Sequence, residues 1–264
     1  MGVALFVISN NSVETKKDAF HKFEPQKSAA FKWSFPDQDW DIREADAALK
    51  HVRQHFEEIE AADFSRDIGG SWRMEGPGNI GGRLNAIAQD PFDSNHILAG
   101  SAAGGLFGTS DGGSNWSPLT DDFAWMAMGS ITFHPSQEGV VYIGSGDPQI
   151  SSHPRLGDGV HRSNDGGASW THLGLDSARI VSKILVLEDS PEIVMAATMG
   201  NPAVKGPDRG LYRSVNSGTT WDQVLLPSDS AGVNDIAYDS STGIMIAAGW
   251  NRLRNSTRSL VFGP

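Results

Sequence analysis

The chain contains no cysteine, which excludes a disulfide framework, a cysteine-ligated zinc site and thiol chemistry. It also lacks any run approaching the roughly 18 consecutive apolar residues of a membrane-spanning helix. Positive charge is scarce: 21 Lys and Arg stand against 32 Asp and Glu, so the net charge is −11. We therefore expect no membrane insertion, no nucleic-acid partner and no anionic membrane surface, because the last two favour a basic patch.

Residues 1–70 differ in pattern from the rest of the chain. An amphipathic helix is predicted over residues 41–62, because six apolar residues recur there three or four apart: Ile42, Ala45, Leu49, Val52, Phe56 and Ile59. Asp41 and Glu44 fit a capping box at its start. The apolar stretch VALFVI at residues 3–8 fits a truncated signal peptide and a buried strand equally well.

From residue 71 to residue 264 the helical period gives way to short apolar runs separated by Gly, Pro, Asn, Asp and Ser. The runs repeat in sets of four, as in SITFHP, VVYIGSGD, GVHRSND and WTHLG. Four short strands in each repeat of about 40–50 residues are typical of a β-propeller blade. We therefore predict an all-β fold, with about three and a half four-stranded blades over residues 80–121, 128–174, 179–226 and 232–264.

One polar turn occurs in nearly the same form in three of these repeats: TSDGGSNW, RSNDGGASW and RSVNSGTTW. The shared positions are Thr109, Asp111, Gly113 and Trp116, then Ser163, Asp165, Gly167 and Trp170, then Ser214, Asn216, Gly218 and Trp221. Asn216 replaces the Asp of the other copies, and an amide can hold a turn but cannot act as a catalytic acid or base. The turn is therefore predicted to be structural, and no catalytic residue is predicted.

These turns resemble the Asp-box, or BNR repeat, with the pattern Ser/Thr-x-Asp-x-Gly-x-x-Trp, which occurs in sialidases, xyloglucan-cleaving endoglucanases and sortilin/Vps10 receptors. Residues 72–91 and 140–148 are also similar to the first two blades of sortilin-like repeat proteins exported by bacteria. The resemblance implies a secreted or cell-surface bacterial location. The count of about three and a half blades further predicts an incomplete propeller whose remaining blades belong to a longer protein, since propellers close with about 4–8 blades.

The connections opposite the Asp-boxes are long and polar, so we expect a glycan or protein ligand on that face. The candidate ligand-binding residues are Arg83, Asp147, His153, Arg155, Asp158, Arg209, Trp250 and Arg252. The alternative is that these loops only extend the rim and order neighbouring blades.

The sequence thus predicts a non-catalytic binding scaffold. The alternative is part of a glycoside hydrolase of the xyloglucanase or sialidase type, which two carboxylates about 5–10 Å apart in one cleft would favour. No cofactor and no metal site are predicted. The motif HVRQH at residues 51–55 has the helical spacing of a zinc site but lacks the Glu that follows the first His in metalloproteases.

Overall fold

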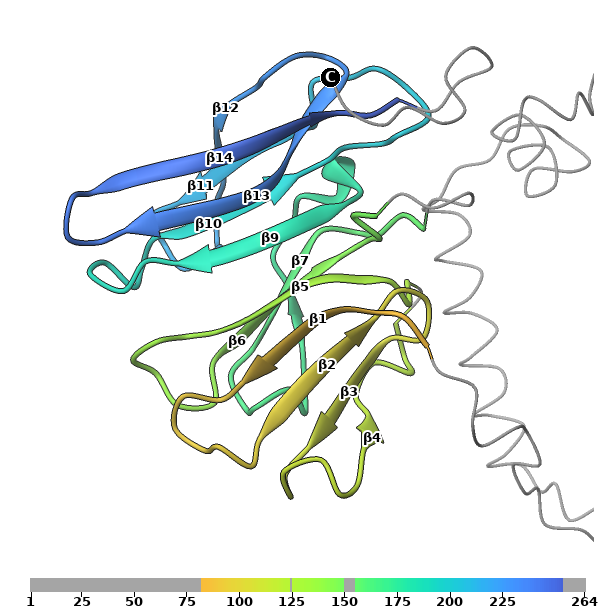
Figure 1. Cartoon of the computed structure of the whole chain (residues 1–264), viewed down its shortest axis with the longest axis vertical. Helices are drawn as coiled ribbons and strands as arrows, with labels where there is room; N and C mark the ends of the chain where they lie inside the picture. Colours follow the sequence, from red (N-terminus) through yellow and green to blue (C-terminus); the bar gives the residue numbers. More distant parts are fainter. Residues whose placement is uncertain (1–81, 124, 150–154, 254–264) are drawn as a thin grey trace, which may run out of the picture.

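The computed structural model describes residues 82–123, 125–149 and 155–253 (Figure 1). The predicted helix over residues 41–62, the rest of the segment 1–70 and the candidate His153 lie outside the described residues. Within them the chain forms three four-stranded antiparallel sheets followed by a two-stranded sheet. The prediction of an all-β fold built from four-stranded units is therefore confirmed.

Each sheet takes its strands in chain order. The first contains β1 (Leu84–Gln89), β2 (Ile97–Ser101), β3 (Leu106–Thr109) and β4 (Ser117–Pro118). The second contains β5 (Met128–Phe133), β6 (Val141–Ser145), β7 (Val160–Ser163) and β8 (Thr171–His172). After the short 3-10 helix η2 (Asp176–Ala178), the third contains β9 (Val181–Val186), β10 (Val194–Thr198), β11 (Gly210–Ser214) and β12 (Asp222–Leu225). β13 (Ala231–Asp239) and β14 (Ile244–Asn251) form the last sheet.

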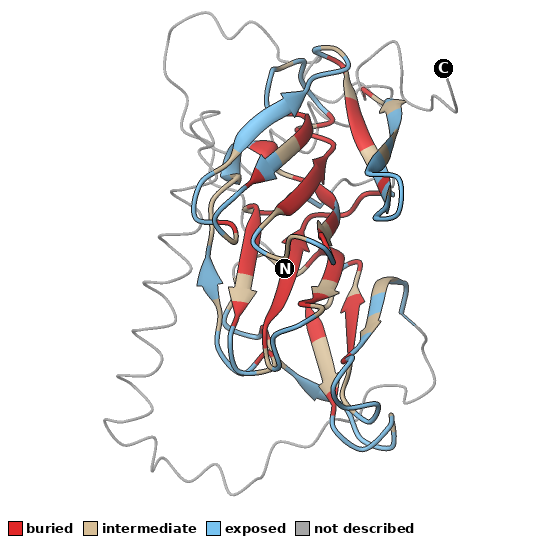
Figure 2. Cartoon of the chain, turned by 90° about the vertical axis from the view of Figure 1, so that its left-hand side faces the viewer, coloured by how far each residue is buried: buried red, intermediate tan, exposed pale blue. Residues whose placement is uncertain are grey.

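The sheets stack face to face, and the first strand of each lies innermost. β1 contacts β5, β5 contacts β9, and β9 contacts β13. The outermost strands are the most exposed, as the pale blue edges in Figure 2 show. β6 and β10 are buried at every residue, because each has a sheet on both faces. A strand covered on both faces reads as a continuous apolar run, which explains the sequence VVYIGS.

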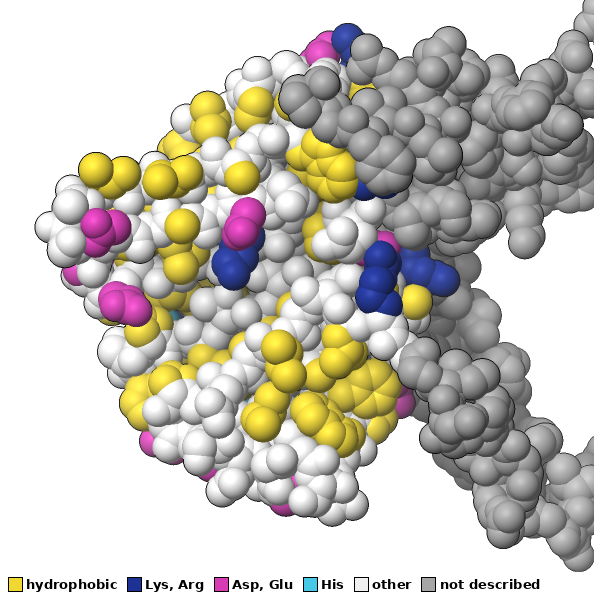
Figure 3. Space-filling view, viewed as in Figure 1, with side chains coloured by type: hydrophobic (Ala, Val, Ile, Leu, Met, Phe, Trp, Pro, Cys, Tyr) yellow, Lys and Arg dark blue, Asp and Glu magenta, His cyan; other side chains and the backbone are white. Residues whose placement is uncertain are grey.

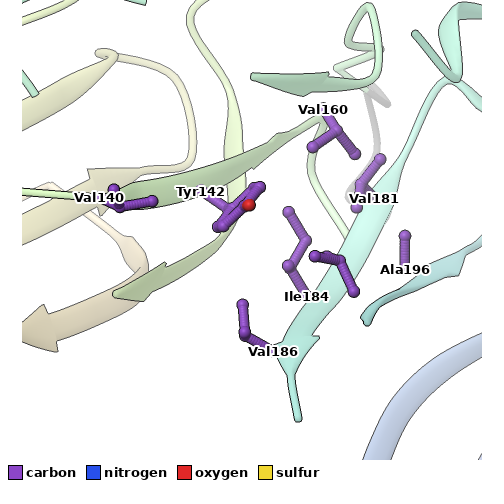
Figure 4. Packing of buried hydrophobic residues seen from close by; sticks show 8 residues of the cluster. Val140, Tyr142, Val160, Val181, Ile184, Val186 and Ala196 are labelled. Carbon is purple, nitrogen blue, oxygen red and sulfur yellow. The ribbon is translucent and has the colours of Figure 1, made fainter. Parts of the chain in front are cut away.

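Each interface between sheets holds its own apolar cluster. Leu98, Leu106, Met128 and Ile143 fill the space between the first and second sheets. Figure 4 shows the next cluster, in which Tyr142 and Val160 of the second sheet face Val181, Ile184 and Val186 of β9. Leu211, Val233 and Ile236 pack between the third sheet and β13. The core is thus a series of layers, one between each pair of neighbouring sheets.

The Asp-boxes all lie at one end of the sheets. Each follows the third strand of its sheet and is bonded to the turn between the first two strands, through Gly112 N to Asn95 O (3.1 Å), Gly166 N to Gly139 O (2.8 Å) and Ser217 N to Glu192 O (2.9 Å). Because the strands are antiparallel, each innermost strand begins at the opposite end. That opposite end also carries the connections from the second to the third strand.

In the described residues no helix is long and apolar enough to cross a membrane.

Candidate functional site

A polar groove lies where the innermost strands begin, at the end of the sheets opposite the Asp-boxes. β1, β5, β9 and β13 all contribute to it, and its volume is about 310 Å³. Its polar lining residues are Asn85, Ser130, Gln149, Ser182, Lys183, Asn234 and Asp235. Figure 3 shows charged side chains of both signs beside the hollow between the sheets. Amide, hydroxyl, ammonium and carboxylate groups together offer both donors and acceptors of hydrogen bonds.

A register shift at the start of each innermost strand shapes this groove. The strand pairing skips one residue in each sheet, and the skipped residues are Asn85, Gly129, Ser182 and Asn234. A β-bulge of this kind bends the strand and turns a side chain away from the regular alternation. The same device therefore recurs at the same place in every sheet.

The bulged residues also connect neighbouring sheets. Asn85 Nδ2 donates to Met128 O (3.0 Å), and Ser182 Oγ donates to Val233 O (2.8 Å). At Gly129 a Cβ atom would collide with the Val181 carbonyl oxygen, so only glycine allows β5 and β9 to approach this closely. The groove floor is consequently built from strands that are held to one another.

Two amide oxygens at these bulges, Asn85 Oδ1 and Asn234 Oδ1, are buried and have no hydrogen-bond partner among the described residues. An unpaired buried acceptor costs about 1–3 kcal/mol. A bound water or a ligand hydroxyl at either oxygen would remove that cost.

Arg83 and Asp147, both predicted ligand-binding residues, pair with each other beside the groove. The Arg83 guanidinium forms an ion pair with the Asp147 carboxylate, which is 1% exposed, whereas the Arg83 side chain is 44% exposed. Asn85 Nδ2 and the backbone N–H of Gln149 also donate to Asp147, over 3.3 and 3.1 Å. Asp147 therefore anchors the β6–β7 connection to the first sheet, and its oxygens are already occupied.

Asp158 lies farther along the same connection and is bonded to two elements. The Ser145 hydroxyl and His161 Nε2 contact Asp158 Oδ1, over 3.0 and 2.9 Å. Burial by itself would raise the pKa of the Asp158 carboxyl. The hydrogen bond and charge of His161, with the charge of His172 and the Ser145 hydroxyl, outweigh burial, so this pKa lies below its usual range.

The remaining predicted residues divide into buried and exposed ones. Arg209 is 1% exposed, and its guanidinium donates to the carbonyls of Asn201 (2.6 Å), Val204 (2.5 Å) and Ser230 (3.1 Å). The Arg209 side chain therefore lies inside the β10–β11 connection and stabilises the backbone of that connection through these hydrogen bonds. Arg155 is exposed, and its carbonyl accepts from Asp147 N over 2.9 Å.

Trp250 and Arg252 lie together at the end of β14. The Arg252 guanidinium carbon is 4.4 Å from the centre of the Trp250 ring, a cation–π arrangement. Trp250 also packs against Ile180 and Met199 in a small apolar cluster that includes Leu156. Among the predicted site residues, the structure thus brings Arg83 into contact with Asp147, and Trp250 into contact with Arg252.

Sequence reasoning missed most of the groove. Asn85, Gln149, Lys183, Asn234 and Asp235 were not among the candidates. Aligning the repeats on the isoleucine shared by the innermost strands would have found four of them, because Asn85, Lys183, Asn234 and Asp235 lie one or two residues before it.

Comparison with known proteins relates the chain to glycan-active enzymes. No protein-family model matches it. A sialidase of Vibrio cholerae is 27% identical over 166 residues, which cover 52% of this chain and 21% of the sialidase. A xyloglucanase of a Paenibacillus species is 24% identical over 190 residues, 66% of this chain and 18% of the xyloglucanase. The chain thus spans about a fifth of the length of these curated relatives.

Among solved structures, an ancestral GH74 enzyme is similar in fold, with a TM-score of 0.52 and 23% identity over 63% of this chain and 22% of that chain. This likeness supports the propeller fold of the described sheets. The sialidase and xyloglucanase relatives agree with a propeller of the Asp-box type. The sortilin-like and Vps10-like part of the resemblance stays a prediction.

Proposed function

We propose that this chain is part of a secreted or cell-surface propeller protein that binds a neutral oligosaccharide in the polar groove. The observation that carries the proposal is the groove itself. It is lined by amide, hydroxyl and charged groups near the β-bulges of the four innermost strands. Sugar hydroxyls both donate and accept hydrogen bonds, so this mixed lining suits them. The net charge of −11 favours a neutral glycan over an acidic one.

The relatives support a glycan as the ligand. Both the sialidase and the xyloglucanase are named for carbohydrate substrates. Since each is matched over about a fifth of its length, the activity of a complete protein, its secreted location and its remaining blades all belong to the proposal.

Binding without hydrolysis is the better account of the groove. Glycoside hydrolysis usually needs a pair of carboxylates, about 5–10 Å apart. Asp235 is the one carboxylate among the groove-lining residues of the described chain, and nearby Asp147 is paired with Arg83. The groove therefore offers the contacts for recognition but lacks a free carboxylate pair.

Calorimetric titration of the full chain with xyloglucan oligosaccharides, and with sialyllactose as an acidic comparison, tests this function. Lys183→Ala and Asn234→Ala should each weaken binding of the neutral glycan by about 3–10-fold, the effect of one lost hydrogen bond. Gln137→Ala changes an exposed residue in the β5–β6 turn, at the Asp-box end, and serves as the matched control. Equal affinities in all three variants would exclude the groove.

Part of a hydrolase is the second candidate, and the enzyme names of the relatives favour it. An assay for released reducing sugar on the same glycans separates the two candidates. Turnover that Asp235→Asn abolishes would favour the hydrolase, whereas binding without turnover supports the scaffold.

A further inference from the structure

Two histidines and an aspartate converge at the outer edge of the second sheet. Each of Asp158, His161 and His172 offers a ligand atom, and these atoms all lie within 4.8 Å of one another. His161 Nε2 is 2.9 Å from Asp158 Oδ1, and His172 Nε2 is 2.7 Å from the Asp158 carbonyl oxygen. A second carboxylate is adjacent, because Asp176 Oδ1 lies 3.3 Å from His172 Nε2.

The fold fixes the positions of these groups. The antiparallel pairing of β7 and β8 sets His161 opposite His172, and their ring centres are 4.9 Å apart. Ser145 holds the third group, since its Oγ accepts from the backbone N–H groups of Asp158 (2.8 Å) and Gly159 (2.9 Å). The Phe123 ring packs against His161 with 4.8 Å between ring centres. The three donors are therefore built on paired strands and on a turn that Ser145 ties down.

We propose that this cluster binds Zn²⁺ through His161, His172 and Asp158, with Asp176 or water as the fourth ligand. Two imidazoles and a carboxylate are a donor set for zinc and other late first-row metals, whereas Ca²⁺ and Mg²⁺ prefer oxygen ligands throughout. With bonds of about 2.0–2.1 Å, donors in a tetrahedral zinc site stand roughly 3.3 Å apart. The present separations need only small side-chain movements to reach that value.

A simple histidine–aspartate hydrogen bond is the competing account of this cluster. The described residues contain such a pair, His96 with Asp90, at 2.9 Å at the Asp-box end of the first sheet. That pair has one imidazole and one carboxylate. The cluster at Asp158 has two imidazoles with both Nε2 atoms directed to the same residue, and Asp176 as well. On binding, zinc would displace the protons that lie between the histidine Nε2 atoms and Asp158 in these short contacts.

The proposed ion would brace the wall of the groove. Asp158 closes the β6–β7 connection, and the same connection carries Asp147 and the groove residue Gln149. A zinc ion bound by Asp158, by His161 of β7 and by His172 of β8 would fix one end of this connection. The Arg83–Asp147 ion pair holds the other end. The site is structural in this account, and it stands whether or not the groove binds a glycan.

Calorimetry and thermal unfolding of the full chain with zinc chloride test the proposal. We expect saturable binding of Zn²⁺ and a rise in the melting temperature that a chelator reverses. His172→Ala removes a ligand that is 39% exposed, so the variant should fold. It should lower the zinc affinity by about 100-fold or more, since loss of an outer-shell partner alone costs roughly 10–100-fold.

His96→Ala is the matched control, because it breaks the other histidine–aspartate pair and should leave the zinc affinity unchanged. In parallel, zinc should shift the imidazole NMR signals of His161 and His172 but not that of His96. The proposal is overturned if the wild-type chain shows no saturable binding, or if His172→Ala binds zinc as tightly as the wild type does.

Discussion

At the scale of single residues, one hydroxyl organises each Asp-box. Ser163 Oγ donates to Asp165 Oδ1 (2.6 Å) and accepts from the backbone N–H groups of Asp165 (3.1 Å) and Gly167 (2.8 Å). In the third box Asn216 Oδ1 takes the place of the carboxylate oxygen and accepts from Ser214 Oγ and Thr220 N, each over 2.9 Å. What the turn requires at this position is therefore an acceptor, and a negative charge is dispensable.

The pH dependence of the boxes follows from these bonds. The hydrogen bonds from Ser163 and then Ser169 lower the pKa of Asp165 to about 2, from an ordinary value of 3.8. A lowered pKa means that this carboxylate stabilises the fold above pH 3.8 and loses that contribution as the pH falls through about 2. We expect carboxyl NMR titration to place the midpoint of Asp165 near 2.

Asp165→Asn is the control for this titration, because Asn216 already shows that an amide fits the position. The variant should fold with little loss of stability at pH 7 and should lose the pH-dependent part between pH 4 and pH 2. A midpoint near 4 for Asp165 would contradict the hydrogen-bonded geometry of the box.

At the scale of elements, the tryptophans of the second and third boxes face the sheet that precedes them in the chain. Trp221 Nε1 donates to Leu173 O of the second sheet over 2.9 Å. Trp170 packs into the cluster between the first and second sheets, but its Nε1 has no hydrogen-bond partner there. Trp116, in the first box, is 41% exposed, and its Nε1 donates within its own turn to Gly113 O.

Trp221→Phe and Trp170→Phe form a matched pair of substitutions. Both remove an indole packed on the preceding sheet, but only Trp221→Phe removes a hydrogen bond. We expect Trp221→Phe to lower the free energy of unfolding by at least about 1 kcal/mol more than Trp170→Phe does, because one such bond contributes about 1 kcal/mol and Trp170→Phe also removes an unpaired buried N–H. Denaturant unfolding of both variants measures the difference, and equal losses would show that the bond to Leu173 contributes nothing.

The Asp-boxes and strands could be predicted from the sequence more readily than the groove and the histidine cluster. The boxes and strands were predictable because turn residues and apolar runs act locally and recur at a fixed interval, so three copies reinforced one another. A single repeat could not reveal the groove, because the bulge at Asn85 or Ser182 depends on strand pairing. Only an alignment of the repeats would have placed the groove residues at matching positions. The cluster of His161 and His172 was not predicted for a similar reason. They are 11 positions apart, and only the β7–β8 register brings them together.

The predicted site residue Arg209 is buried, and its guanidinium contacts the backbone of its own loop. Arg209 looked like a ligand-binding residue because arginine in a polar loop is usually exposed. The loop instead folds around its guanidinium, and burial lowers the pKa of Arg209 although Asp229 and Asp208 oppose that shift. Three backbone carbonyls compensate the buried group, an arrangement that composition alone could not reveal.

At the scale of the whole molecule, apolar side chains are exposed on both the first and the last described sheet. Ile87 of β1 is 67% exposed and Ile246 of β14 is 68% exposed. Figure 3 shows hydrophobic side chains over both regions. Exposed apolar surface on a sheet favours association with other chains.

We therefore expect the double variant Ile87→Lys, Ile246→Lys to self-associate less than the wild-type chain. Light scattering during size-exclusion chromatography, over a range of protein concentrations, measures this. The double variant Val224→Lys, Leu225→Lys introduces the same charge at two residues of the outer strand β12 that are 50% and 42% exposed, and it serves as the control. If the control lowers association as much as the double variant does, the effect comes from net charge and not from the two isoleucines.

The direction in which the box tryptophans point has a consequence for how the molecule folds. Because Trp170 and Trp221 each pack on the sheet before their own, the second and third sheets complete these interfaces only when the preceding sheet is folded as well. Coupling of this nearest-neighbour kind makes the array behave as a one-dimensional chain of cooperative units. Weakening one interface should then divide amide hydrogen exchange into two separately opening groups, with the boundary at the altered sheet.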